Sequence, residues 1–248
     1  MIASPIGCEF HSLPSIDSTN LHAMRQIHAR MAEHGTVFFT THQTAGRGQR
    51  GKQWHGNPND NLALSAVLRT QDLAKTHQFK LSAAMALATR QLVANHINQA
   101  VSIKWPNDIY VGSKKIAGIL IENIIQAATW RWSVVGLGLN VNQTKFGPNL
   151  PWATSAQMLT GQSFSPEQLA VHWCTFAQKQ WERIFGPDSN DIVTEYNQHL
   201  YGINTIQRLK KDNVVIPCLI KRVTLQGVLV AGEHDEWAFE HGAVEWLR

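Results

Sequence analysis

Residues 104–122 read Lys-Trp-Pro-Asn-Asp-Ile-Tyr-Val-Gly-Ser-Lys-Lys-Ile-Ala-Gly-Ile-Leu-Ile-Glu, and their pattern is that of a β-sheet. The run Val101–Trp105 alternates apolar and polar residues as a strand does, and Pro106 is predicted to end it, because proline cannot donate to a sheet ladder. Ile109–Val111 and Ile116–Ile121 are rich in β-branched residues and flank a Gly-Ser turn. This arrangement predicts a β-hairpin directly after the first strand.

Upstream of this stretch, strands alternate with helices. Ser18 or Asp17 is expected to cap a helix, because apolar residues recur after them at helical spacing as far as Met31. Gly35 is predicted to end this helix. Strands are also expected at 37–41 and 62–68, and an alanine-rich helix at about 73–97.

Downstream, Trp132–Val141 reads as a strand interrupted by Gly136 and Gly138. Glycine inside a strand often marks the close approach of a ligand or of another backbone. Residues 142–164 are expected to be irregular. Two helices should follow, one from Ser165 to just before Gly186 and a short one at 192–200.

After Gly202 the chain loses its helical period. Short strand-like runs are separated by turns as far as residue 248, which is typical of a small barrel. The prediction is therefore an α+β body over residues 1–202, with a mixed sheet and flanking helices, followed by a small all-β domain over residues 203–248.

The composition indicates a protein that handles anions in a reducing compartment. The 248 residues carry 22 Lys and Arg against 18 Asp and Glu, a formal net charge of +4, without the sustained basic run of a nucleic-acid-binding arm. The three cysteines form no C-x-x-C pair, and no apolar run approaches membrane-spanning length. A cytoplasmic location is expected, with no membrane or nucleic-acid partner and no metal site built from the histidines.

The most distinctive loop reads Gly-Arg-Gly-Gln-Arg-Gly at residues 46–51 and continues to Trp54. Its glycines let the backbone wrap closely around a ligand, and Arg47, Arg50 and Lys52 supply cationic donors. The spacing G-x-G-x-x-G imitates a dinucleotide fingerprint, but the next residues include glycine, proline and asparagines and do not open a helix. An anion-binding loop and a solvated turn both remain open on this motif alone.

Four other segments are individually ambiguous. Ser18 and its neighbours could simply cap a helix, and Gln43 could be a surface residue. The Lys-Trp-Pro-Asn-Asp run from Lys104 could be an ordinary turn or the rim of a site. Lys115 opens a strongly apolar strand, where its ammonium would act more strongly than in water, although the same residues could form an exposed hairpin turn.

Together, five segments resemble one family, the biotin–protein ligases. The family's loop G-R-G-R-R-G-x-x-W is matched at 46–54, its K-W-P-N-D at 104–108, and its K-[LIV]-[AG]-G-[IL]-L-[IVT]-E at 115–122. Its D-S-T-N is matched at 17–20 and its G-[IL]-G-[IL]-N at 136–140. The resemblance is to the monofunctional type that lacks an N-terminal DNA-binding domain, since only 16 residues precede Asp17.

This resemblance implies a fold and an activity. The fold is a biotin/lipoyl ligase-like catalytic domain with an SH3-like β-barrel after it. The activity is an ATP- and Mg²⁺-dependent ligation in which biotin is converted to biotinyl-5′-AMP and then transferred to a lysine of a biotin carboxyl carrier protein, a subunit of acetyl-CoA carboxylase. Repression of transcription is not expected, and a homodimer is left open.

The resemblance also implies the site residues. Lys115, Arg47, Lys104 and Asp108 would be catalytic, and any Mg²⁺ would arrive with ATP. Residues implied to bind biotin or its adenylate are Ser18, Thr19, Asn20, Gln43, Gly46, Arg47, Gly48, Gln49, Arg50, Gly51, Trp54, Asn107, Lys115, Gly118, Asn140 and Trp152.

One residue departs from the family pattern. Gln49 stands where the family usually has arginine, so one charge-assisted phosphate contact is missing, and we expect the adenylate to be held less tightly than in an arginine-bearing relative. Two other functions remain alternatives: transfer of lipoate or octanoate by an enzyme of the same superfamily, and non-catalytic binding of biotin or a nucleotide.

Overall fold

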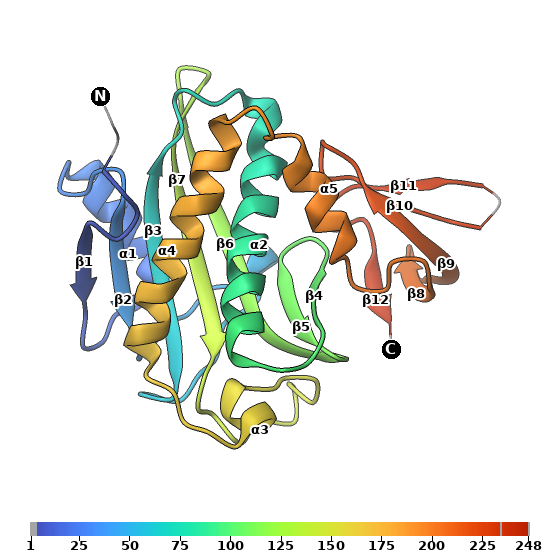
Figure 1. Cartoon of the computed structure of the whole chain (residues 1–248), viewed down its shortest axis with the longest axis horizontal. Helices are drawn as coiled ribbons and strands as arrows, with labels where there is room; N and C mark the ends of the chain where they lie inside the picture. The colour runs from blue at the N-terminus through green and yellow to red at the C-terminus, as the bar shows by residue number, and fades with distance from the viewer. Residues whose placement is uncertain (1–3, 234, 248) are drawn as a thin grey trace.

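A seven-stranded mixed sheet forms the body of the protein in the computed structural model, which describes residues 4–233 and 235–247 (Figure 1). Only its edge pair, β1 and β2, is parallel, and all other neighbours are antiparallel. In sheet order the strands are β1 (Glu9–Ser12), β2 (Thr36–Thr40), β3 (Asn61–Arg69), β7 (Thr129–Asn140), β6 (Lys114–Gln126), β5 (Asp108–Val111) and β4 (Val101–Lys104).

Helices cover both faces of this sheet. Helices α2 (Gln78–His96) and α4 (Pro166–Phe185) lie side by side over one face, where the main hydrophobic core is buried (Figure 1). The shorter helix α1 (Thr19–His28) packs on the opposite face against a separate small cluster that includes Val67 and Val134. Because side chains alternate along a strand, the same strands serve both layers.

The starts of α1 and α4 follow the sequence prediction, and the end of α1 does not. The Ser18 hydroxyl accepts from the Leu21 N–H, and the Ser165 hydroxyl accepts from the Gln168 N–H at 3.3 Å. The prediction that α1 extends to Met31 is wrong, because the helix ends at His28 and the chain turns into the left-handed region at Arg30, with a φ of 57°.

Two local predictions need correction. The stretch 142–164, expected to be irregular, contains a short helix, α3 (Ala156–Thr160), capped by Ser155. The alanine-rich helix begins at Gln78 rather than near residue 73, after a single 3₁₀ turn at Lys75–His77. Helix α5 (Asp191–Gln198) lies where the second short helix was expected. Among the described helices, none combines the length and apolar character needed to span a membrane.

A second, five-stranded antiparallel sheet forms the C-terminal part, as the run of short strands predicted. The expected runs at 214–216 and 219–223 form one continuous strand that contains Pro217, and the strand at Ile206–Lys211 was not predicted. In sheet order these strands are β11 (Trp237–Phe239), β10 (Leu229–Ala231), β9 (Val214–Val223), β8 (Ile206–Lys211) and β12 (Glu245–Leu247).

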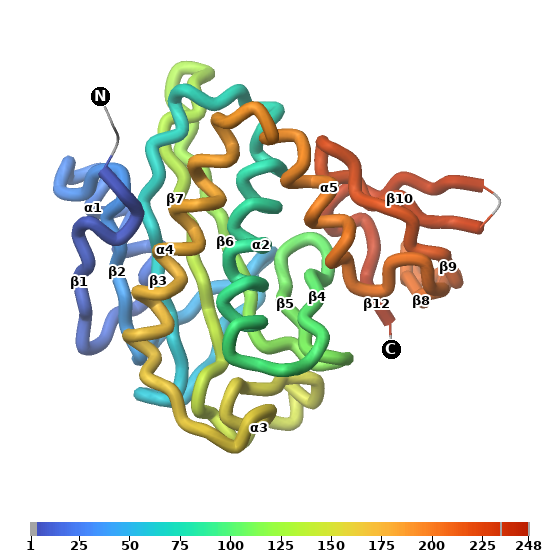
Figure 2. The backbone as a smooth tube through the Cα atoms, in the orientation of Figure 1, coloured from blue at the N-terminus to red at the C-terminus, as the bar shows by residue number. Residues whose placement is uncertain are grey.

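The second sheet lies beside α5 and the hairpin of β4 and β5 (Figure 2). The buried indole N–H of Trp105 donates to the Gly227 carbonyl at 2.9 Å. The Asn197 side chain donates to the Val223 carbonyl and accepts from the Val223 N–H. The domain boundary at residue 202 stays a prediction, and these buried contacts show that the two sheets share an interface.

Candidate functional site

A cavity of about 50 Å³ opens on the α1 face of the main sheet. Its walls come from the start of α1, the glycine loop (residues 46–54), and strands β6 and β7. The lining residues are Ser18, Thr19, Asn20, Gln43, Arg47, Gly48, Gln49, Trp54, Leu64, Asn107, Lys115, Gly118, Ile119, Leu120, Gly136, Leu137 and Gly138.

Three glycines on neighbouring strands make the floor of the cavity. Gly118 of β6 pairs with Gly138 of β7, and Gly136 is the next residue of β7 on that face. A Cβ atom on Gly136 would overlap the amide of Asn20, and one on Gly138 would overlap the indole of Trp54. Another group therefore approaches the backbone at both positions, as glycine inside the predicted strand indicated.

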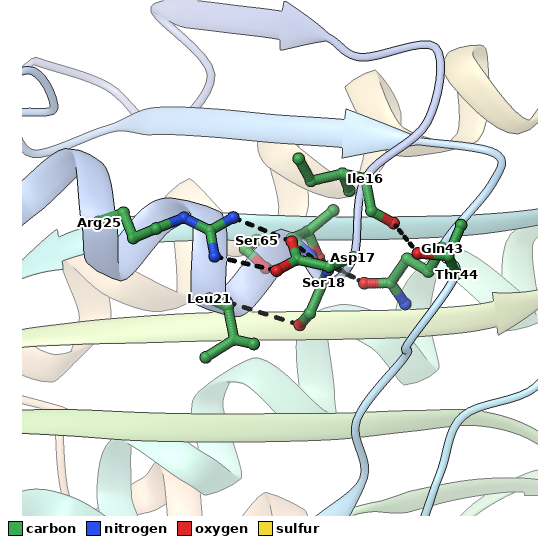
Figure 3. Close-up of polar contacts among 9 residues, drawn as sticks. Ile16, Asp17, Ser18, Leu21, Arg25, Gln43, Thr44 and Ser65 are labelled. Carbon is green, nitrogen blue, oxygen red and sulfur yellow. Dashed lines mark hydrogen bonds and ion pairs between the residues drawn. The ribbon is translucent and has the colours of Figure 1, made fainter.

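A polar slot at one end of the cavity is made of Thr19, Asn20 and Ser65, which are buried, and Gln43, which is half-buried; all but Ser65 line the cavity. Figure 3 shows Gln43 and Ser65 beside the start of α1. The Gln43 Oε1 atom accepts from the Thr19 N–H at 2.8 Å and from the Thr19 hydroxyl at 3.1 Å. The Ser65 hydroxyl lies 2.6 Å from Asn20 Oδ1, to which it donates, and 2.8 Å from Thr19 Oγ1. Each group orients its neighbour, so the slot is fixed before any ligand arrives.

An ion pair anchors this slot from outside. The Arg25 guanidinium binds both carboxylate oxygens of Asp17 at 2.9 Å (Figure 3). These hydrogen bonds lower the pKa of the Asp17 carboxyl to about 2. The Asp17 side chain also accepts from the Ser18 N–H at 2.7 Å, which fixes the residue that caps α1.

Glu122 connects the polar slot to the glycine loop. Its Oε2 atom accepts from the Asn20 amide at 2.8 Å, while its Oε1 atom lies 3.3 Å from Nη1 of Arg47. The Arg47 side chain is 44% exposed, so its guanidinium remains open to an incoming anion.

Lys115 stands at the other side of the cavity. Its ammonium lies 2.6 Å from the Asp108 carboxylate and 5.7 Å from the centre of the Trp54 ring. The Asn107 amide donates to the Ile119 carbonyl at 2.6 Å and holds the turn that carries Asp108. Two cations, each balanced by a carboxylate, thus face one cavity, an arrangement suited to receiving the anionic part of a ligand whose polar head fills the slot.

The structure brings most of the predicted site residues together and leaves others outside the cavity. Asp108 touches the cavity only through Lys115, and Gly46 packs beneath Trp54. Residues of the predicted set that line the cavity are Ser18, Thr19, Asn20, Gln43, Arg47, Gly48, Gln49, Trp54, Asn107, Lys115 and Gly118; those that do not are Gly46, Arg50, Gly51, Lys104, Asp108, Asn140 and Trp152.

Three of the outlying residues have other surroundings. The Lys104 ammonium lies over the ring of Tyr110 at 5.0 Å and over that of Trp246 at 5.3 Å, at the junction of the two sheets. Asn140 is buried and donates to the Thr154 carbonyl at 2.9 Å. The Trp152 side chain is 47% exposed on the surface.

Sequence reasoning missed two residues that shape the site. Ser65 is a lone hydroxyl inside a strand whose other residues from Leu62 to Leu68 are apolar, and that interruption was the available signal. Glu122 closes one of the recognised motifs, yet its side chain was given no role, because its two partners lie 102 and 75 positions away in the chain.

Comparison with known proteins shows the family of the chain. The model of the biotin/lipoate A/B protein ligase family matches residues 12–140. The bifunctional ligase/repressor BirA of Bacillus subtilis is 31% identical over 186 residues, which cover 73% of this chain and 57% of that protein. The biotin–[acetyl-CoA-carboxylase] ligase of Paracoccus denitrificans is 34% identical over 161 residues, covering 63% and 66%.

Solved structures share the fold across the whole chain. Biotin protein ligase from Aquifex aeolicus in complex with biotin and ATP aligns with a TM-score of 0.82 at 19% identity, covering 97% of this chain and 99% of that one. The α+β body with a small β domain is thereby confirmed. The matched segment contains the polar slot, the glycine loop, the glycine floor and both cations of the cavity, and the chain therefore belongs to the biotin/lipoate A/B protein ligase family.

Proposed function

We propose that this protein is an ATP-dependent biotin–protein ligase. It would join biotin to ATP as biotinyl-5′-AMP, release pyrophosphate, and pass the biotinyl group to a lysine of a biotin carboxyl carrier protein. The Paracoccus relative is named as a ligase of this kind, and the Aquifex structure holds biotin and ATP. The chain spans 57% of the length of the Bacillus protein, so the name of that relative does not by itself establish the activity of this chain.

One observation carries the proposal: a buried polar slot leads directly to a pair of cations. The slot presents oriented amide and hydroxyl groups, which suit a ureido ring that both donates and accepts hydrogen bonds. At the far end, Arg47 and Lys115 face the same cavity. A molecule with a polar ring at one end and a carboxylate at the other fits this order of groups.

The residues of the cavity would assist the first step by placement and charge. A carboxylate and a polyphosphate repel one another, so Arg47 and Lys115 would neutralise both as they meet. Asp108 would hold the Lys115 ammonium at the cavity, since the two groups lie 2.6 Å apart. Charges fixed in advance act strongly at the phosphorus atom where charge develops, and removing one such contact costs about 10²- to 10³-fold in rate.

The mixed anhydride must be kept from water. The glycine loop forms one wall of the cavity, and we propose that it closes over the adenylate to exclude solvent. Mg²⁺ would enter with the phosphates of ATP, because the described residues contain no group of three side chains able to hold a metal ion. The three cysteines stand as free thiols, which supports action in the reducing cytoplasm.

The main rival is transfer of lipoate or octanoate, which the family name also covers. An aliphatic acyl chain would form no hydrogen bonds with the polar groups of this slot, whereas a ureido ring both donates and accepts them. Incubation with ATP and either radiolabelled biotin or radiolabelled lipoate separates the two. Faster labelling of the acceptor by lipoate would overturn the proposal.

The decisive test is the intact mass of a biotin carboxyl carrier domain after incubation with biotin, ATP and the purified protein. A mass increase of one biotinyl group is expected, with loss of activity in Lys115→Ala. Lys114→Ala is the matched control, because that neighbouring side chain is exposed and does not line the cavity. Equal activity in the two variants would contradict the assigned role of Lys115.

Repression of transcription, part of the name of the Bacillus relative, is outside the proposed activity. A specific gel shift with an operator-like duplex would add it. Homodimer formation is likewise open, and sedimentation with and without biotin and ATP would measure it.

A further inference from the structure

The glycine loop is held by the opposite end of the chain. Arg50 donates from Nη1 to the Gly242 carbonyl and from Nη2 to the His241 carbonyl, each at 2.7 Å. Beside it, the His241 Nε2 atom lies 2.8 Å from Oε1 of Gln49. The two sets of residues are 191 to 192 positions apart, so these three bonds join the cavity wall to a C-terminal turn (residues 240–243).

The backbone on both sides of this contact is shaped for it. Gly242 has a φ of 79°, and a Cβ atom there would overlap the Arg50 guanidinium. Arg50 itself lies in the left-handed region with a φ of 55°, which a non-glycine residue keeps only where its surroundings impose it. Glycine at 242 thus provides both the turn and the space in which the guanidinium sits.

The chemistry of the third bond fixes the orientation of Gln49. An amide oxygen can only accept, so this hydrogen bond requires the tautomer of His241 that carries its proton on Nε2. The groups that face His241 are the Arg50 guanidinium, the Gln49 amide and the edge of the Trp105 ring. Burial and the Arg50 charge lower the pKa of His241, which favours the neutral ring. With its oxygen held this way, Gln49 is left with its amide N–H groups for the cavity that it lines.

We propose that His241 is a positioning residue: it orients the Gln49 amide so that its N–H groups donate to an anion held between Arg47 and Lys115. Arg50 keeps the glycine loop close enough to the C-terminal turn for this contact to form. The inference rests on the proposed function, in which this anion is the phosphate of the adenylate. The uncharged side chains of Gln49 and His241, which lie far apart in the sequence, together supply the hydrogen-bond donor that one cationic side chain could supply.

A double-mutant cycle tests the pairing. His241→Phe removes the N–H but keeps a ring against Trp105, Gln49→Ala removes the amide, and the third protein carries both changes. The dissociation rate of biotinyl-5′-AMP from the full chain is the readout. Each single variant should release it on the order of threefold to tenfold faster, and the double variant no faster than the quicker single. Multiplicative effects would overturn the pairing.

Two further variants separate positioning from general damage. His241→Gln can still donate an N–H to Gln49 and should restore most of the retention. Glu236→Gln is the matched control, because Glu236 lies in the same sheet region, pairs with Lys221 and Arg222, and makes no contact with the loop. Release accelerated equally by Glu236→Gln would contradict a specific role for His241.

A second readout does not depend on the proposed function. Amide hydrogen exchange over residues 46–54 in the ligand-free protein should speed up in His241→Phe and in Gly242→Ala, and stay unchanged in Glu236→Gln. Unchanged exchange in both of the first two variants would overturn the anchor. If the wild type releases no pyrophosphate with biotin and ATP, the proposed function fails, whereas the exchange result still decides whether the C-terminal turn holds the loop.

Discussion

The two walls of the cavity are built in opposite ways. The polar slot is buried and closed on itself: Thr19, Asn20 and Ser65 are at most 3% exposed and hydrogen-bonded to one another and to Gln43. The glycine loop is mostly exposed: Arg47 pairs with Glu122, and three hydrogen bonds join Gln49 and Arg50 to a distant turn. A recognition surface gains from rigidity, because its order is established during folding, whereas a covering segment must open and therefore has few contacts to break.

The largest loss of biotin binding should come from placing a side chain at the glycine floor beside the polar slot. Gly136→Ala places a Cβ atom into the Asn20 amide, and the slot must shift to make room. Since small displacements of a positioned group can cost about 10²-fold, we expect biotin binding to weaken by about that factor. Calorimetric titration with biotin measures it. Gly147→Ala, where a Cβ atom meets nothing within 4 Å, is the control, and comparable loss in both would show that the glycine floor is not special.

A smaller loss of binding or stability should follow from removing one hydrogen bond inside the polar slot without adding any atoms to it. Ser65→Ala removes the hydroxyl that donates to Asn20 and leaves a buried amide oxygen without its donor. Such a group costs about 1–3 kcal/mol, so we expect biotin binding or global stability to fall by that amount. Urea unfolding and biotin titration together measure where the loss appears. No change in either quantity would mean that the slot is not preorganised by Ser65.

A positive charge added to the glycine loop should slow the release of the adenylate. Gln49→Arg gives up the bond to His241 and gains a charge-assisted bond to the adenylate phosphate, which is about twice as strong as a neutral one. We expect biotinyl-5′-AMP to leave roughly threefold to tenfold more slowly, on that basis. Stopped-flow release of the intermediate gives the rate. The idea is wrong if the arginine variant releases it as fast as the wild type.

The smallest effect concerns the anchor of the slot at the protein surface. The pKa of Asp17 is lowered from its ordinary 3.8 to about 2, so its pair with Arg25 contributes stability above pH 3.8 that is lost as the pH falls toward 2. Both side chains are more than a third exposed, and such a pair contributes about 0–1 kcal/mol. Urea midpoints of the wild type and Arg25→Gln should differ slightly at pH 6 and converge at pH 2. A constant difference at both values would assign the effect to something other than Asp17.

Contiguous motifs located the site well, because each lies at the end of a strand or helix that the sequence marks clearly. Gly118 and Gly138 are adjacent in the sheet, and Lys115 lies on the strand that the opening hairpin predicts. The cap at Ser18 was visible for the same reason, since it needs only its own neighbours. Local rules suffice wherever a position is fixed by residues a few places away.

Contacts between residues far apart in the chain could not be predicted from the sequence. Nothing near Arg50 in the chain indicates that its guanidinium binds carbonyls at 241 and 242, and Lys104 gives no hint of the aromatic rings of Tyr110 and Trp246 around it. The early end of α1 shows the same limit, because Met31 fits the apolar spacing but lies 71% exposed beyond the helix. These positions are decided by tertiary packing, which periodicity does not record.

The Arg50 contact also means that the glycine loop is secured late during synthesis of the chain. All seven strands of the main sheet and the polar slot have been synthesised by residue 140, about a hundred residues before His241 and Gly242. A ribosome adds about 5–20 residues per second, so the strands of the main sheet exist for several seconds before the loop gains this contact. The turn at residues 240–243 therefore acts as a completion mark: the cavity wall gains this support only after residues 241 and 242 have been synthesised.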